Sequence, residues 1–262
     1  MALRLVVRSL SELCLTVGTL IVLFVVYVLY WTGVQAQGAS ADQIDSLQRE
    51  WTTAPVENAP APGSGPGSGP GSGPDSVPAP VGEPSAAPPR ARVAPSPPPP
   101  YTPGKGIAVM YVPRLGADWK WPVLEGTGPA VLKKGLGHYA GTARLGETGN
   151  FSVAGHRRTY GDPFKDFPRL RPGDAVVLTD GTTWFTYRVD RGPYRTVPGD
   201  VGVVAPVPEP FRKNAAGFTG PGRYLTLTTC DPEWGSSHRL VVWGHLDATQ
   251  PVTDGRPQAL DS

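Results

Sequence analysis

The stretch TLTTCDPEWGSSHRLVVWG, residues 226–244, contains two apolar runs separated by residues that favour turns. The first run ends at Cys230, and the second begins after Arg239. The segment between them is rich in Asp, Pro, Gly and Ser, which is the composition of a loop between two strands. We therefore expect an antiparallel hairpin in which Cys230 and Arg239 lie roughly opposite each other.

Leucines alternate with polar residues in the run RYLTLTTC, residues 223–230. Because successive side chains of a strand point to opposite faces, Leu225 and Leu227 share one face, and Thr228 and Cys230 share the other. In a barrel the leucines point inward. The thiol is then expected on the outer surface, beside a groove.

Short extended runs with turn signals between them recur from about residue 107 to residue 246. One pair of runs flanks Asp180-Gly181, a strong hairpin signal. Strands and helices do not alternate as they do in a parallel α/β sheet. The folded part is therefore predicted to be all-β, either a sandwich or a barrel, with a few short helices.

The N-terminal region contains 19 uncharged residues, 13–31, which is long enough to cross a bilayer about 30 Å thick as a helix. Arg4 and Arg8 precede this run, so residues 1–12 are predicted to be cytoplasmic and the rest extracellular. A cleaved signal peptide is the alternative, because VQAQGA at 34–39 offers small residues. The apolar run exceeds the usual core of a signal peptide, so we favour an uncleaved anchor.

Residues 32–105 are predicted to be a disordered linker. They are rich in Pro, Gly, Ala and Ser and contain three GSGP units within residues 63–74. A packed domain is expected at 106–250, followed by a C-terminal tail at 251–262. The chain has 24 Lys and Arg against 22 Asp and Glu without long runs, so nucleic acid is not an expected partner.

The chain has two cysteines, and Cys14 lies in the apolar N-terminal run. Cys230 is then the only thiol in the exported part, which points either to a reactive thiol or to a small buried side chain. A reactive cysteine usually needs a nearby imidazole. Of the four histidines, His156 follows the apolar strand FSVAG and opens a loop, where a rigid scaffold can hold a functional group.

Three ordered blocks, GHYAGTARLGETGN, AGHRRTYGDPF and TLTTC followed by RLVV, resemble the sortases. The spacing is most similar to the class E, housekeeping-type sortases of high-GC Gram-positive bacteria. The resemblance covers about residues 108–246. It implies a closed eight-stranded β-barrel and a membrane-bound cysteine transpeptidase.

The resemblance implies that Cys230 is the nucleophile, His156 the general acid and base, and Arg239 the group that stabilises the oxyanion or the substrate. It also implies an LAxTG- or LPxTG-like sorting signal on secreted proteins, and a lipid II-like peptidoglycan precursor whose amine is the acceptor. His138, Thr228 and Thr229 are further candidates for substrate binding, although the threonines could simply be β-branched strand residues. No cofactor or metal is expected.

Two other functions remain open. A secreted thiol protease would pass the acyl group to water, and a non-catalytic envelope-binding module would not need the thiol. An L,D-transpeptidase is not indicated, because the chain lacks a Ser-His-Gly-Cys run.

Overall fold

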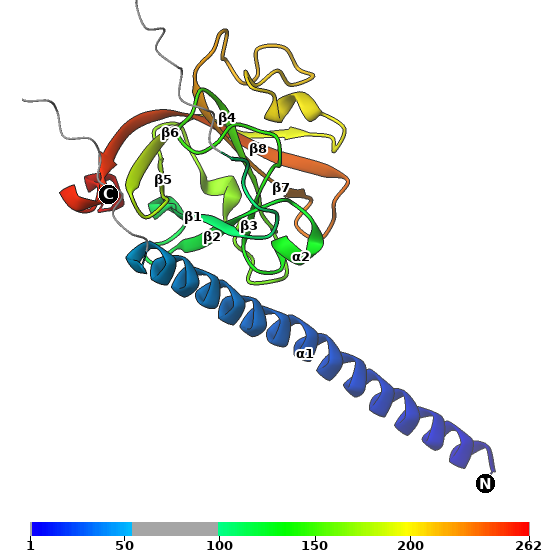
Figure 1. Ribbon diagram of the computed structural model, residues 1–262. Coiled ribbons are helices and arrows are strands. Elements are labelled where there is room, and N and C mark those ends of the chain that lie inside the picture. Colours follow the sequence, from blue (N-terminus) through cyan, green and yellow to red (C-terminus); the bar gives the residue numbers. More distant parts are fainter. Residues whose placement is uncertain (1, 54–98, 262) are drawn as a thin grey trace, which may run out of the picture. The chain divides into compact units, whose positions relative to one another are not determined.

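The computed structural model describes residues 2–53 and 99–261, and within these ranges eight strands form a closed barrel (Figure 1). The predicted eight-stranded barrel is thereby confirmed. Around the barrel the strands follow the order β1, β2, β3, β4, β7, β8, β6, β5. Their bounds are β1 Gly106–Tyr111, β2 Lys120–Glu125, β3 Leu136–His138, β4 Gly149–Ala154, β5 Ala175–Thr179, β6 Thr183–Thr196, β7 Arg223–Asp231 and β8 His238–Pro251.

The barrel is of mixed strand direction. The pairs β2–β3 and β4–β7 are parallel, and the other neighbours are antiparallel. The predicted hairpin at Asp180-Gly181 joins β5 to β6. It is stabilised by the Asp180 carboxylate, which accepts hydrogen bonds from the backbone N–H groups of Thr182 and Thr183, both at 2.9 Å.

The inside of the barrel is filled by apolar side chains that alternate with outward-facing residues along each strand. Leu225 and Leu227 of β7 belong to this core, as the alternation predicts. The neighbouring Thr226 donates instead to Asn150 and to the carbonyl of Val203, outside the barrel wall. The alternation of side chains along the strand thus decides which side chains of β7 lie outside the barrel, where they are available to a ligand.

Short helices connect or flank the strands. They are α2 at Pro129–Leu132 and the single-turn segments η1 Pro113–Leu115, η2 Phe167–Arg169, η3 Val201–Val204, η4 Val252–Asp254 and η5 Gln258–Leu260. The last two lie in the predicted C-terminal tail. Their Val252 and Leu260 pack against a buried cluster that contains Trp184, so this tail adds to the barrel wall.

Helix α1 spans Ala2–Thr53 and corrects one prediction. The composition predicts a disordered linker from residue 32, whereas residues 32–53 are helical. The physical reason is that the first proline after residue 31 is Pro55, so nothing before that point interrupts the helix. Ile44 and Leu47 share one face of α1 and pack with Val109 of β1. Residues 54–98 of the predicted linker lie outside the described residues.

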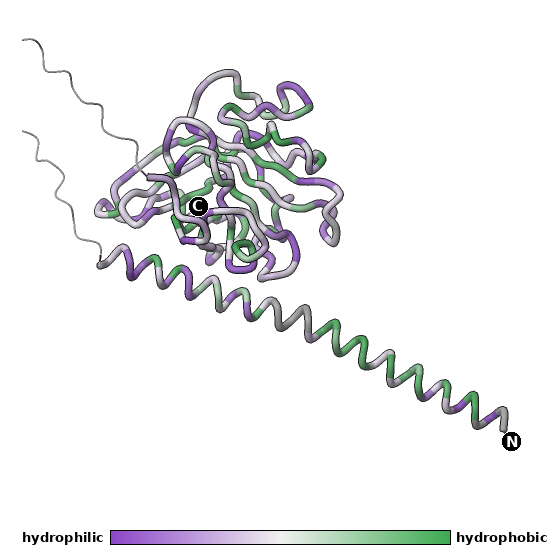
Figure 2. The backbone as a smooth tube through the Cα atoms, turned by 45° about the vertical axis from the view of Figure 1, so that its right-hand side comes forward, coloured by the Kyte–Doolittle hydropathy of each residue, from purple (hydrophilic) through white to green (hydrophobic). Residues whose placement is uncertain are grey.

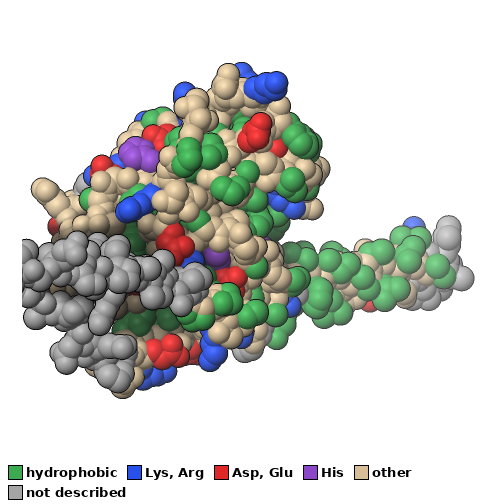
Figure 3. All heavy atoms as spheres, turned by 45° about the horizontal axis from the view of Figure 1, so that its top comes forward, with side chains coloured by type: hydrophobic (Ala, Val, Ile, Leu, Met, Phe, Trp, Pro, Cys, Tyr) green, Lys and Arg blue, Asp and Glu red, His purple; other side chains and the backbone are tan. Residues whose placement is uncertain are grey.

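Residues Val6–Tyr27 of α1 are long and apolar enough to cross a membrane, as an anchor or a signal sequence would. This segment overlaps the predicted span 13–31 but begins earlier, and it includes Arg8 and Glu12, which form an ion pair at 3.1 Å. Hydrophobic residues are concentrated in the N-terminal half of α1 (Figure 2), and their side chains cover much of its visible surface (Figure 3).

Replacing an inward leucine of β7 should destabilise the barrel. Leu227 is fully buried, so Leu227→Ala should lower the free energy of unfolding by about 2–5 kcal/mol. The exposed Lys165 provides the control, and Lys165→Ala should change it by less than about 0.5 kcal/mol. Urea titrations followed by tryptophan fluorescence measure both changes. A loss below about 1 kcal/mol for Leu227→Ala would contradict the inward orientation.

Candidate active site

Cys230 and Arg239 are direct partners in the antiparallel ladder between β7 and β8. This pairing confirms the predicted hairpin, and the strands lie side by side at the barrel wall (Figure 1). Cys230 is a free cysteine and is half-buried. The loop 232–237 therefore brings a thiol and a guanidinium to the same end of two neighbouring strands.

His156 reaches this end through the parallel pairing of β4 with β7. The last registered pair is Ala154 with Thr228. Beyond it, the Gly155 N–H donates to the Thr228 carbonyl at 3.1 Å, and the Thr229 hydroxyl donates to the Gly155 carbonyl at 2.8 Å. His156 therefore follows directly on the strand end that is fastened to Thr228 and Thr229, the two residues before Cys230.

The chain around His156 is tightly constrained. At Gly155 an added Cβ would lie 2.6 Å from Cδ2 of Phe164, so a larger residue would push the strand end away from the core. The loop that follows places four consecutive residues, 159–162, at positive φ: 69°, 51°, 82° and 52°. Left-handed backbone at non-glycine residues costs free energy and often occurs at functional sites.

The His156 imidazole is half-buried and lies 5.2 Å from the Tyr160 ring, measured between centroids. Burial lowers the pKa of His156 below its ordinary value of about 6.5. The positive charge of Lys133 lowers the pKa further, and the negative charge of Asp162 opposes both effects. The neutral ring, which can accept a proton, is therefore the favoured form at pH 7.

The Arg239 side chain is oriented by its own loop. Its Nη1 donates to the carbonyl oxygens of Ser236 and His238, each at 2.9 Å. Arg239 also lines a cavity of about 90 Å³ on the outer side of β7 and β8, which we call the Arg239 cavity. Its other lining residues come from β3–β4, β6, the segment around η3, β7 and β8: Tyr139, Thr196, Val197, Pro198, Asp200, Val201, Val203, Val204, Thr228 and Val241.

The two candidate threonines of β7 face opposite ways. Thr228 lines the Arg239 cavity, and its hydroxyl is 2.9 Å from the Tyr139 hydroxyl. Thr229 is buried, and it donates to the backbone beside His156 rather than facing the cavity. The structure therefore brings Thr228 to a position where it could meet a ligand, and gives Thr229 the role of holding the end of β4.

His138, the third candidate for substrate binding, does not line the Arg239 cavity. It is 2% exposed, and its ring stacks on Phe151 of the barrel core. Its Nδ1 lies 2.5 Å from the Glu125 carboxylate, and its Nε2 lies 2.9 Å from the Thr142 hydroxyl. Both ring nitrogens thus have internal hydrogen-bonding partners.

Tyr139, the neighbour of His138, is the cavity residue that sequence reasoning missed. The signal was the alternation of side chains along a strand: if His138 enters the core, the next residue faces the other way. Within residues 2–53 and 99–261, no group of three or more His, Cys, Asp or Glu side chains is placed to hold a metal ion.

Comparisons of the sequence point to one family. The model of the sortase domain matches residues 110–247. Sortase SrtE1 of Streptomyces coelicolor is 33% identical over 262 residues, covering 97% of this chain and 61% of that protein. This chain therefore spans less than two thirds of the length of SrtE1. Sortase SrtE2 of the same organism is 30% identical over 256 residues, covering 95% of this chain and 85% of that protein.

Solved structures give the same result. Sortase E from Streptomyces avermitilis is 69% identical, with a TM-score of 0.56, and covers 61% of this chain and 99% of that one. Sortase E1 from Streptomyces coelicolor, solved with a tripeptide in the active site, is 38% identical, with a TM-score of 0.55 and the same coverage.

The environment of His156 predicts a depressed pKa that depends on Lys133. Histidine NMR titration should give a pKa below about 6.5. Lys133→Gln should raise this value, because it removes a positive charge that disfavours the imidazolium. Lys165→Gln is the charge-matched control and should leave it unchanged. A pKa above about 6.5 in the unsubstituted protein, or a further fall in Lys133→Gln, would contradict this account.

Proposed function

The chain belongs to the sortase family, and we propose on this basis that it is a membrane-anchored cysteine transpeptidase. It cleaves the Thr–Gly bond of an LAxTG- or LPxTG-like sorting signal and transfers the secreted protein to an amine of a peptidoglycan precursor. The observation that carries the proposal is the register of β7 and β8, which pairs Cys230 directly with Arg239. The parallel pairing of β4 with β7 supports it, because β4 ends two residues before His156.

The first half of the reaction forms a thioester. The Cys230 thiolate attacks the threonine carbonyl of the sorting signal, and the carbonyl oxygen becomes an oxyanion. Arg239 donates hydrogen bonds to that oxygen or to the neighbouring substrate carbonyl. Imidazolium at His156 gives its proton to the departing glycine amine, so that the peptide bond breaks and the thioester remains on Cys230.

The second half regenerates the thiolate. The acceptor amine attacks the thioester carbonyl, and neutral His156 removes the extra proton from the attacking nitrogen. The new amide forms as the carbon–sulfur bond breaks. The depressed pKa of His156 favours this base role, because it keeps the neutral ring abundant at pH 7.

The Arg239 cavity supports a binding site for the sorting signal. It adjoins Arg239 and opens beside the hydroxyl groups of Thr228 and Tyr139. Apolar side chains of the segment around η3, including Val201 and Val204, form another wall. A short peptide with small and apolar residues before its threonine suits this mixture of polar and apolar surface.

The N-terminal helix supports the proposed location. Arg4 and Arg8 lie at its start, so the positive-inside bias keeps the N-terminus in the cytoplasm. The barrel then lies outside the cell, where secreted proteins and cell-wall precursors are accessible.

The decisive experiment identifies the products. Detergent-solubilised protein is incubated with an LAxTG or LPxTG peptide and candidate amines, and products are identified by mass. Transfer to an amine supports the transpeptidase, whereas release of the free acid alone would favour a thiol protease. Absence of cleavage with every peptide would leave only the binding module.

Cys230→Ala should abolish turnover, because it removes the only nucleophile in the mechanism while the barrel stays folded. The matched control is Cys14→Ala, which changes the other cysteine of the chain and should leave the rate unchanged. Peptide cleavage and thermal unfolding are measured on both variants. Turnover at the unsubstituted rate by Cys230→Ala would rule out the mechanism.

Arg239→Lys separates hydrogen bonding from charge. Lysine keeps the positive charge but loses the planar fork of donors. The cleavage rate of Arg239→Lys should therefore be close to that of Arg239→Ala, and both rates should be about 10²-fold or more below that of the unsubstituted protein. Alkylation of Cys230 by iodoacetamide should change much less, since that reaction forms no oxyanion. If Arg239→Lys cleaved at nearly the unsubstituted rate, charge rather than directed hydrogen bonding would be the role of Arg239.

A further inference from the structure

One charged network joins the sequence neighbours of the three proposed catalytic residues. Arg157 follows His156, Asp231 follows Cys230, and His238 precedes Arg239. These residues, together with Arg195 of β6, form a continuous chain of hydrogen bonds that we call the Asp231 network. None of the four has a part in the acyl-transfer steps described above.

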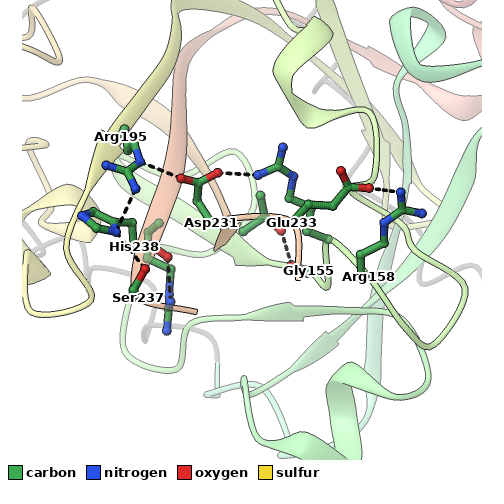
Figure 4. Close-up of polar contacts among 10 residues, drawn as sticks. Gly155, Arg158, Arg195, Asp231, Glu233, Ser237 and His238 are labelled. Carbon is green, nitrogen blue, oxygen red and sulfur yellow. Dashed lines mark hydrogen bonds and ion pairs between the residues drawn. The ribbon is translucent and has the colours of Figure 1, made fainter. Parts of the chain in front are cut away.

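Asp231 is the centre of this network. Its Oδ1 accepts from Nη1 of Arg157 at 2.5 Å, and its Oδ2 accepts from Nε of Arg195 at 2.6 Å. Arg195 then donates from Nη2 to Nδ1 of His238 at 3.0 Å. Figure 4 shows Arg195 lying between Asp231 and His238 in this way.

The Asp231 network connects four separate parts of the chain. Arg157 lies in the loop after β4, Arg195 in β6, Asp231 at the end of β7 and His238 at the start of β8. The register makes the last two direct partners, one position beyond Cys230 and Arg239. The carboxylate of Asp231 therefore ties His156's loop to the ladder that holds the other two catalytic residues.

A second ion pair connects the same two parts of the chain. Arg158 pairs with Glu233, so a further link joins the loop after β4 to the loop between β7 and β8 (Figure 4). The guanidinium of Arg158 also lies over the Trp234 ring, 4.9 Å from its centroid. Two ion pairs, Arg157 with Asp231 and Arg158 with Glu233, thus hold the loop after β4 against the end of β7 and the loop that follows it.

The burial of the central pair distinguishes it from ordinary surface ion pairs, which contribute little. The side chains of Arg157 and Asp231 are 12% and 16% exposed, whereas Arg195 is 54% exposed. Hydrogen bonds from Arg195 and Arg157 lower the pKa of the Asp231 carboxyl, Arg195 having the larger effect, although desolvation opposes them. The carboxylate therefore stays charged at neutral pH.

We propose that Asp231 is a positioning residue that holds His156 and Arg239 in register with Cys230 through Arg157, Arg195 and His238. The inference rests on the proposed function. Each catalytic side chain lies at or just beyond the end of a strand, where the backbone opens most easily. Acyl transfer needs the nucleophile, the proton carrier and the oxyanion donor to be aligned at the same moment. One carboxylate shared by two guanidinium groups supplies that alignment from outside the reacting atoms.

The substitution that tests this is Asp231→Asn, which keeps the size of the side chain. It replaces one acceptor oxygen by an NH₂ group that faces a guanidinium donor. Alignment matters for chemistry more than for peptide binding, so kcat should fall by about 10-fold or more while KM stays within about 3-fold. Alkylation of Cys230 by iodoacetamide should stay within about 3-fold, because the thiolate attacks this reagent directly, without an oxyanion and without proton transfer to a leaving group. Asp231→Glu should recover part of the lost kcat.

The matched control is Asp247→Asn. Asp247 also pairs with an arginine of β6, Arg188 at 3.1 Å, but it lies farther along β8 from Arg239. It should leave kcat unchanged. Arg195→Gln provides a second variant at a more exposed position, in case Asp231→Asn is unstable. Because Asp231 and Arg195 act through one contact, the losses of kcat in the double variant should be smaller than the product of the two single losses.

All variants are compared in the full-length, detergent-solubilised protein, with thermal unfolding measured alongside. An unchanged kcat in both Asp231→Asn and Arg195→Gln would overturn the inference. So would equal losses in cleavage and alkylation, or full multiplication of the two losses. The proposed function fails separately: if the unsubstituted protein cleaved no sorting-signal peptide, the transpeptidase itself would be rejected before any variant was compared.

Discussion

The antiparallel ladder between β7 and β8 is the constraint on which the site depends. It pairs Cys230 with Arg239, and it sets Leu225 and Leu227 inside the barrel at the same time. Because the side chains of a strand alternate, a slip by one residue would turn the thiol into the core and the leucines outward. The burial of the leucines thus fixes where the thiol faces, so the same register decides the packing of the core and the position of the proposed nucleophile.

A second constraint brings His156 to that ladder. The parallel pairing of β4 and β7 closes a long loop of chain, and the backbone bonds of Gly155 and the hydroxyl of Thr229 fasten its last residues. The Asp231 network lies just beyond, at the ends of the same strands. The strand ladders, the hydroxyl of Thr229 and the ion pairs of the Asp231 network therefore all restrain the same strand ends. Such restraint suits a proposed site in which three side chains must be aligned.

Local sequence patterns predict the features that depend on strand periodicity and turn composition. The alternation of residues 223–230, the turn at Asp180-Gly181 and the pairing of Cys230 with Arg239 follow from strand period and turn composition. The Asp231 network could not be predicted in this way, because Arg157 and Arg195 lie more than 30 residues from Asp231 in the sequence. His138 and Tyr139 show the limit of prediction from sequence. The sequence identifies this segment as a candidate part of the site, but it does not show that the His138 side chain enters the core, where its ring stacks on Phe151. Residues 32–53 are helical because they contain no proline, and the proline-rich composition that predicts a disordered linker begins only after them.

The proposed mechanism requires that Cys230, held opposite Arg239, forms a covalent acyl intermediate. The most direct measurement is the mass of the intact protein after incubation with a sorting-signal peptide in the absence of an acceptor amine, quenched in acid and mapped by digestion. We expect an adduct on Cys230 with the mass of the peptide portion up to and including threonine, and this adduct should disappear when an amine is added. Cleavage without any adduct on Cys230, or with an adduct on another residue, would contradict it.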